Sequence, residues 1–120
     1  MKVLLPYSVH HIVSYVFGGT GNTLTAIFGD EVNGSQITWF QNYYPMRDVR
    51  NLILFTSTPP YWATNSSGTK GSQRGANSID NSCRIYVPDT AVDAYKNSGA
   101  DMWGNFANRI YPISEFEGEL

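Results

Sequence analysis

One stretch, residues 83–113, constrains the fold of this 120-residue chain more than any other. Its first segment, RIYV, is β-branched and aromatic, which favours a strand on a half-buried surface. Pro88 ends that strand because proline has no N–H to donate to a neighbouring strand. Thr90 with Asp93 three residues later is a capping-box pattern, and it predicts that a helix begins here.

A second helical segment and a closing strand complete this unit. Gly99 suits the left-handed position that ends a helix. Met102, Trp103 and Phe106 then recur at helical spacing. Residues 110–113 (IYPI) form a strand that is terminated by its proline. The unit is therefore predicted to be strand, helix, short helix and strand, with no group of obvious chemistry in it.

The same stretch resembles a known repeat family. Residues 85–96 (IYVPDTAVDAYK), Trp103 and residues 109–113 (RIYPI) resemble the last repeat of BspA-like leucine-rich-repeat proteins. Residues 52–60 look like the preceding repeat, and the tail at residues 113–120 is similar to the C-termini of phage structural proteins that carry this module. Proteins of this family occur on bacterial surfaces and, in gut bacteria, in phage and prophage virions. The resemblance covers roughly the second half of the chain.

This resemblance implies a β-rich α+β fold, namely a short leucine-rich-repeat-like β-solenoid with a helix-containing C-terminal cap. We expect an N-terminal β-rich segment at residues 1–50 and a leucine-rich-repeat-like module at residues 51–120, packed as one structural domain. The segment at residues 60–83 is longer than the family pattern, and the first half shows no clean repeat. The strands expected to stack as rungs are centred near four isoleucines, Ile37, Ile53, Ile85 and Ile110.

Strand-forming runs also occupy the first half. Residues 3–5, 24–28 and 36–40 are predicted strands, and the last two could pair as a hairpin. Residues 9–17 fit both strand and helix spacing, and β-branched residues favour the strand. Residues 63–82 are rich in Ser, Asn, Gly and Thr, so this segment cannot bury a core of its own. We expect it to be mobile or pinned against a neighbour.

The charge pattern excludes two classes of partner. Net charge is −2, and 15% of the residues are charged, without a basic cluster, which argues against nucleic acid and an anionic membrane surface. No apolar run approaches the roughly 18 residues of a membrane span, so membrane insertion is not expected. The first residues imitate a signal peptide, but no small-residue cleavage site follows. We expect assembly in a cytoplasm, as for virion proteins, or an export signal that was removed.

Candidate chemical motifs favour structural roles. Residues 18–23 (GGTGNT) lack the Gly-Lys-Ser/Thr ending of a phosphate-binding loop and are expected to form a turn. The neighbouring His10 and His11 would point to opposite faces of a strand, with no further histidine to complete a metal site. Cys83, the single cysteine, is expected to be a small buried apolar residue. We therefore expect no enzyme activity, no cofactor and no metal.

Aromatic residues are the remaining candidates for binding. Aromatic residues make up 14% of the chain, and rings with polar tips serve both carbohydrate and protein interfaces. Burial in the core is the competing explanation for Trp39 and for half of the tyrosines. Tyr61 and Trp62 follow two prolines at the mouth of a polar loop, and they are the pair expected to be exposed. The candidate binding residues are Trp39, Tyr43, Tyr44, Tyr61 and Trp62.

These observations predict a non-enzymatic phage virion component, such as a fibre, tail or capsid-decorating protein, that acts by protein–protein contact. Its partners would be other virion proteins and further copies of itself in a homo-oligomer, with a surface glycan or host receptor as a further ligand. The alternative is a bacterial cell-surface or secreted leucine-rich-repeat adhesin module that binds glycan or host protein. A small hydrolase is a third, disfavoured alternative.

Overall fold

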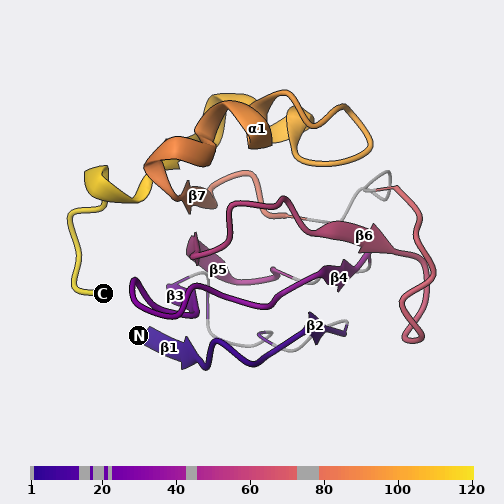
Figure 1. Ribbon diagram of the computed structural model, residues 1–120, viewed down its shortest axis with the longest axis horizontal. Helices are drawn as coiled ribbons and strands as arrows, with labels where there is room; N and C mark the ends of the chain where they lie inside the picture. Colours follow the sequence, from indigo (N-terminus) through magenta and orange to yellow (C-terminus); the bar gives the residue numbers. More distant parts are fainter. Residues whose placement is uncertain (1, 14–16, 18–20, 22, 43–45, 73–78) are drawn as a thin grey trace.

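Two parallel β-sheets form the framework of this protein (Figure 1). The computed structural model describes residues 2–13, 17, 21, 23–42, 46–72 and 79–120. In spatial order, the larger sheet contains β1 (Lys2–Leu5), β3 (Leu24–Phe28), β5 (Val49–Leu54), β7 (Arg84–Val87) and β8 (Ile110–Pro112). The smaller sheet contains β2 (His11–Ile12), β4 (Trp39–Gln41) and β6 (Tyr61–Ala63).

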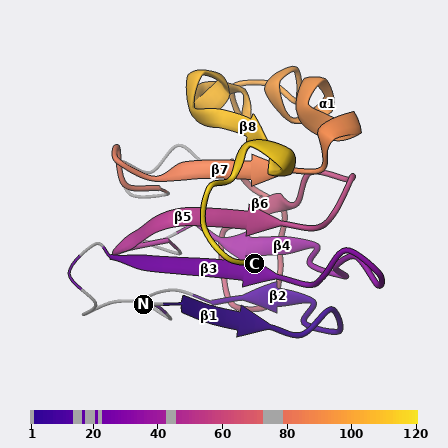
Figure 2. The same ribbon diagram turned by 90° about the vertical axis from the view of Figure 1, so that its left-hand side faces the viewer.

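From β1 to β7 the chain alternates between the two sheets, and the strands that pair within each sheet run parallel. Parallel neighbours need a long crossover between them. For the pairs from β1 to β7, a strand of the other sheet forms part of the crossover, whereas helical segments connect β7 to β8. Figure 1 shows the two sheets side by side. Figure 2 shows the strands of the larger sheet stacked from β1 at one end to β7 and β8 at the other.

Short helical turns lie over the β7–β8 end of the larger sheet (Figure 2). The predicted capping box is not formed, because neither helix start has a side-chain cap. Instead, the Ala91 N–H donates to the Pro88 carbonyl and closes a tight first turn. Gly99 has φ +104°, which confirms its left-handed conformation after the helix. The helical elements are η1 (Asp89–Ala91), α1 (Val92–Lys96), η2 (Gly104–Arg109) and η3 (Ile113–Glu115).

An aromatic cluster fills the core between the sheets and the helical turns. Phe40 in β4 lies 5.4 Å from Phe28 in β3 and 5.8 Å from Trp62 in β6, measured between ring centroids. Trp62 in turn lies 4.9 Å from Trp103, which lies 5.6 Å from Tyr95 of α1. These five rings are fully buried. Elements from both halves of the chain therefore share one core.

The predicted fold class is wrong. The expected α+β solenoid with a helical cap is replaced by a small α/β domain with two parallel sheets and little helix, measuring 31 × 31 × 27 Å. Both sheets bury large aromatic side chains between them, so the chain closes around a shared core. The boundary expected between residues 50 and 51 lies within β5.

Several predicted strands are confirmed, but one predicted pairing is wrong. The strands at residues 24–28 and 84–87 have the expected bounds, and those at residues 3–5 and 110–113 differ by one residue. Residues 24–28 and 36–40 do not form a hairpin, because β3 and β4 belong to different sheets. Ile37 precedes its strand, whereas the other three isoleucines lie on neighbouring strands of the larger sheet, in β5, β7 and β8.

Candidate functional site

The outer face of the larger sheet carries two rows of side chains that cross the strands. Side chains alternate between the faces of a strand, so residues two apart along each strand share this face. The strand register aligns a polar row, made of Lys2, Thr25, Asn51 and Arg84. It also aligns an apolar row, made of Leu4, Ile27, Ile53, Tyr86 and Tyr111.

The C-terminal tail covers the middle of the apolar row. Figure 2 shows the tail passing from β8 back across this face and ending beside β3. The Phe116 ring packs edge-on against Tyr86 at 5.0 Å between centroids, and it belongs to a second apolar cluster with Ile27 and Ile53. Leu4 lies beyond this cover and is 63% exposed. The tail therefore leaves a pocket over the polar row and a groove near Leu4.

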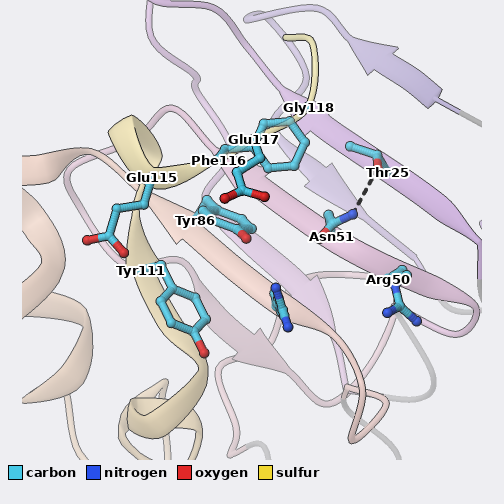
Figure 3. Close-up of a pocket in the computed structure, with 10 residues that line it drawn as sticks. Thr25, Arg50, Asn51, Tyr86, Tyr111, Glu115, Phe116, Glu117 and Gly118 are labelled. Atoms are coloured by element: carbon cyan, nitrogen blue, oxygen red, sulfur yellow. Dashed lines mark hydrogen bonds between the residues drawn. The ribbon is translucent and has the colours of Figure 1, made fainter.

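The first of these, the arginine–tyrosine pocket, has a volume of about 520 Å³ (Figure 3). Its floor comes from β3, β5, β7 and β8, and its rim comes from η3 and the tail. It is lined by Thr25, Arg50, Asn51, Arg84, Tyr86, Tyr111, Glu115, Phe116, Glu117 and Gly118.

A β-bulge places Arg50 in the lining of this pocket. Leu24 pairs with Val49 and Thr25 pairs with Asn51, so Arg50 is an extra residue in β5 without a partner in β3. A bulge interrupts the strict alternation of side chains and redirects the extra residue. Arg50 and its neighbour Asn51 consequently both line the same pocket, as Figure 3 shows.

The pocket combines cations, aromatic rings and hydrogen-bonding groups. The guanidinium groups of Arg50 and Arg84 make no hydrogen bond or ion pair with the part of the chain that the structure describes. The Asn51 amide donates to the Thr25 hydroxyl at 3.2 Å. The Tyr86 and Tyr111 rings lie 5.6 Å apart, and Tyr111 is the more exposed of the two. This arrangement can hold a polar ligand that has a flat face and an anionic group.

Two acidic side chains of the tail region complete the rim. Figure 3 shows Glu115 on the Tyr111 side of the pocket, away from Arg50, and Glu117 nearer to Tyr86. Both glutamates are exposed. They balance the formal charge of the two arginines and offer carboxylate acceptors to hydroxyl groups.

The second feature, the edge groove, lies at the other end of the apolar row and has a volume of about 720 Å³. Val32 is 91% exposed and Leu120 is 54% exposed, and both line the groove together with Leu4. Asp30 and Glu31 supply its acidic side. Hydrogen bonds from the backbone and the side chain of Asn33 lower the pKa of Asp30, so its carboxylate remains charged. The groove adjoins β1, the outermost described strand of the larger sheet.

The aromatic residues expected to bind a ligand lie mainly in the smaller sheet. Trp62 faces the core with 0% exposure, so the expectation that it is exposed is wrong. Trp39 stacks on His11, with ring centroids 4.4 Å apart, and is nearly buried. Tyr61 is partly exposed, and its hydroxyl donates to the Gly68 carbonyl at 2.6 Å. Tyr43 and Tyr44 lie outside the described residues, and the binding role of all five residues stays a prediction.

Cys83 is fully buried, which confirms the expected packing role. Burial raises the pKa of its thiol to about 12, although the nearby Arg109 acts in the opposite direction. The thiol is therefore protonated at neutral pH and is a poor nucleophile. Within the described ranges, no group of three or more His, Cys, Asp or Glu residues could hold a metal ion. None of the described helices is long and apolar enough to cross a membrane.

Comparisons with protein-family models, curated proteins and solved structures find no match to this chain. The candidate site therefore depends on the geometry of the outer face. Sequence reasoning missed the arginine–tyrosine pocket and the edge groove. The signal for the pocket was one polar residue, Thr25, Asn51 or Arg84, in each of three otherwise apolar or aromatic segments, and the strand register aligns these three residues.

Proposed function

We propose that this protein is a non-enzymatic structural or attachment component of a phage virion that acts by protein–protein contact. The observation that supports this proposal is the edge groove, where Leu4, Val32 and Leu120 expose apolar surface beside the outermost described strand. Exposed apolar groups that gather in one place favour a protein partner. The proposal that the protein belongs to a virion rests on the resemblance of the C-terminal unit to BspA-like repeats.

A second copy of this chain is the partner that the charges favour. Lys2 lies at the start of β1, whereas Asp30 and Glu31 line the groove near the end of β1. If two β1 strands pair in antiparallel fashion about a two-fold axis, each Lys2 approaches the acidic side of the other copy. The same pairing covers Leu4 of both copies and joins the two larger sheets.

Self-association would also explain how a small module contributes to attachment. Each isologous contact repeats the same patch on both copies, and a symmetric particle displays many copies. Linked copies raise the overall affinity for a surface without any new contact in the individual module. Cys83 is buried and protonated, so the chain's single thiol is a poor nucleophile, which supports a non-catalytic role.

Size-exclusion chromatography with light scattering tests the contact. We expect the wild-type protein to be a dimer or a larger symmetric species. Val32→Asp should shift it to the monomer, because the new carboxylate would be buried beside Glu31 in the contact. Val13→Asp is the matched control, since Val13 is 39% exposed and does not line the groove. A wild-type monomer at every concentration, or equal effects of both variants, contradicts the proposed contact.

Particle composition tests the virion setting separately. An antibody against this protein should label purified phage particles in electron microscopy, and the protein should be found in their mass spectra. Labelling of intact bacterial cells without labelling of particles would instead support the surface adhesin. The arginine–tyrosine pocket is the specific observation that favours this second candidate, because it offers a ligand site distinct from the edge groove.

A further inference from the structure

We propose that the arginine–tyrosine pocket binds a saccharide that carries a carboxylate group. The carboxylate would lie between Arg50 and Arg84, and the sugar ring would lie against Tyr111. This inference goes beyond the proposed virion role, because it concerns a small ligand on the outer face of the larger sheet. It does not require self-association at the edge groove.

The arginines indicate the anionic part of the ligand. They come from neighbouring strands, and Arg84 pairs in register with Asn51, the residue that follows Arg50. Neither guanidinium has a hydrogen-bonding or ionic partner among the residues that the structure describes. A guanidinium presents a planar set of N–H donors that matches the two oxygens of a carboxylate. Two such groups in the lining of one pocket favour a carboxylate over a neutral ligand.

The bulge gives a second, independent reason. An unbroken β5 strand would place Arg50 and Asn51 on opposite faces, because side chains alternate along a strand. The extra residue allows both to line the pocket. Bulges are common next to binding and catalytic sites, where they redirect a side chain. The bulge in β5 therefore adds the Arg50 guanidinium to the pocket.

Tyr111 and the surrounding acceptors indicate the rest of the ligand. A partly exposed ring offers flat apolar area to the C–H face of a sugar, and its hydroxyl remains a polar handle. Glu117 can accept hydrogen bonds from sugar hydroxyls, and the carbonyl of the Asn51 amide adds a further acceptor. Because the rim also carries Glu115, a ligand with many negative charges would be repelled. A sugar with one carboxylate would pair with the arginines and offer hydroxyl groups to the acceptors, without the repulsion that a ligand with many negative charges would meet.

The size of the pocket agrees with a small saccharide. Its volume of about 520 Å³ lies within the range of roughly 300–1,000 Å³ that is usual for small-molecule sites. Tyr86, 6% exposed, packs edge-on against Phe116, and the two rings form one side of the pocket.

Calorimetry and NMR titration of the 120-residue protein test this site with defined probes. Methyl glucuronoside and N-acetylneuraminic acid carry the carboxylate, and methyl glucoside is the neutral counterpart. We expect the two acids to bind and the neutral sugar to bind at least tenfold more weakly. Arg84→Met and Arg50→Met should each weaken binding of the acids at least tenfold, and Tyr111→Leu should weaken binding of all three sugars.

Lys96→Met is the matched control, because it removes an exposed cation that does not line the pocket. It should leave affinity unchanged, and circular dichroism should show that every variant is folded. Absence of binding to both acids overturns the proposal, as does equal affinity for the acids and the neutral sugar. Equal binding of a glutamate-rich peptide would assign the pocket to acidic peptides and overturn the saccharide assignment. Dimerisation is measured separately, so failure of one proposal is distinguishable from failure of the other.

Discussion

Polar groups inside the aromatic core donate hydrogen bonds to backbone carbonyls of distant segments. The Tyr95 hydroxyl donates to the Thr56 carbonyl at 2.8 Å, and the Trp103 indole N–H donates to the Pro60 carbonyl at 2.8 Å. The Trp62 indole N–H donates to the Met102 carbonyl at 3.0 Å. Each bond joins α1, or the segment between α1 and η2, to a strand or loop of the preceding β5–β6 region. These side chains therefore fix the position of the helical turns as well as filling the core.

Tyr95→Phe should destabilise the protein by about 1 kcal/mol, because it leaves the partly buried Thr56 carbonyl without this donor. Tyr7→Phe removes the same atom from a side chain that is 43% exposed, and it should change the free energy of unfolding by less than about 0.5 kcal/mol. Urea unfolding of both variants measures the difference. Equal effects would contradict a buried hydrogen bond at Tyr95.

Cys83 should contribute a pH dependence to stability. Its pKa is about 12 in the folded protein against an ordinary value of 9.0, because burial disfavours the thiolate. The folded state therefore keeps a proton that the unfolded state loses above pH 9.0. This contribution is complete below pH 9.0 and is lost as the pH rises toward 12. Burial raises the pKa of Tyr95 as well, so that residue adds to the loss at higher pH.

Urea unfolding at a series of alkaline pH values measures this effect. Cys83→Ala should reduce the decline in the free energy of unfolding relative to the wild type, while the contribution from Tyr95 remains. In the wild type, a thiol reagent should react with Cys83 only after denaturant is added. Rapid reaction in the native state, or an unchanged decline in Cys83→Ala, would show that the thiol is accessible or titrates normally.

At the scale of the elements, the turn after β3 depends on a glycine. Gly29 has φ +84°, and a Cβ atom there would lie 2.0 Å from the Gly34 carbonyl oxygen. The backbone of Gly29 also donates to the Leu5 carbonyl, which ties this turn to the end of β1. Backbone atoms cannot move aside as a flexible side chain can. A residue with a side chain therefore fits this turn only if the backbone shifts.

Gly29→Ala should destabilise the protein by more than about 3 kcal/mol, since it combines the left-handed backbone with a backbone clash. Gly21→Ala is the matched control, because Gly21 has φ +72° and the described residues beyond its chain neighbours place no atom within 4 Å of the added Cβ. It should cost only about 1–2 kcal/mol for the left-handed conformation. Thermal and urea unfolding compare the two variants. A similar loss in both would mean that the clash at Gly29 is relieved.

The strands could be predicted from sequence better than their pairing could. Runs such as residues 24–28 and 84–87 contain β-branched and aromatic residues between turn-forming ones, so local composition identifies them. Partners are set by contacts between strands that are separated in the sequence by a strand of the other sheet or, for β7 and β8, by helical segments. No local pattern carries that information. The sequence of the short β6 strand accordingly predicts an exposed aromatic pair, whereas its register turns Trp62 into the core.

The candidate site could not be predicted from the sequence, because it too depends on which strands lie side by side. A bulge in β5 decides that Arg50 reaches the pocket, and the two consecutive polar residues that it leaves in the sequence do not by themselves identify a bulge. Tyr111 belongs to a strand that was identified, but only the sheet order shows that it lies beside Tyr86. The tail residues gain their role by folding back across the sheet. Residue types were visible in the sequence, and their proximity was not.

At the scale of the whole molecule, both sheets and the helical turns share one aromatic core. Phe40 contacts rings from β3, from β6 and from the segment that follows α1. Removal of this ring should therefore weaken all parts of the fold together. The expectation of a single structural domain stays a prediction, and unfolding experiments address it directly.

Phe40→Ala should lower the free energy of unfolding by about 3–5 kcal/mol, the usual cost of deleting a buried phenylalanine ring. Tryptophan fluorescence from the core and far-ultraviolet circular dichroism should follow one coincident transition in wild type and variant. Two separate transitions would indicate that residues 1–50 and 51–120 unfold independently.

The alternation of the chain between two sheets also has a kinetic consequence. Lys2 pairs with Thr25, and Asn51 pairs with Arg84, so partners in neighbouring strands are 23 and 33 positions apart. The chain between two partner strands must close into a loop before the strands can pair. The entropy lost in closing that loop exceeds the stabilisation from the first contacts between the strands. Folding should accordingly take roughly milliseconds to seconds, as in other small proteins dominated by non-local pairing. During that interval the apolar strands are uncovered, and association between incompletely folded chains competes with correct folding.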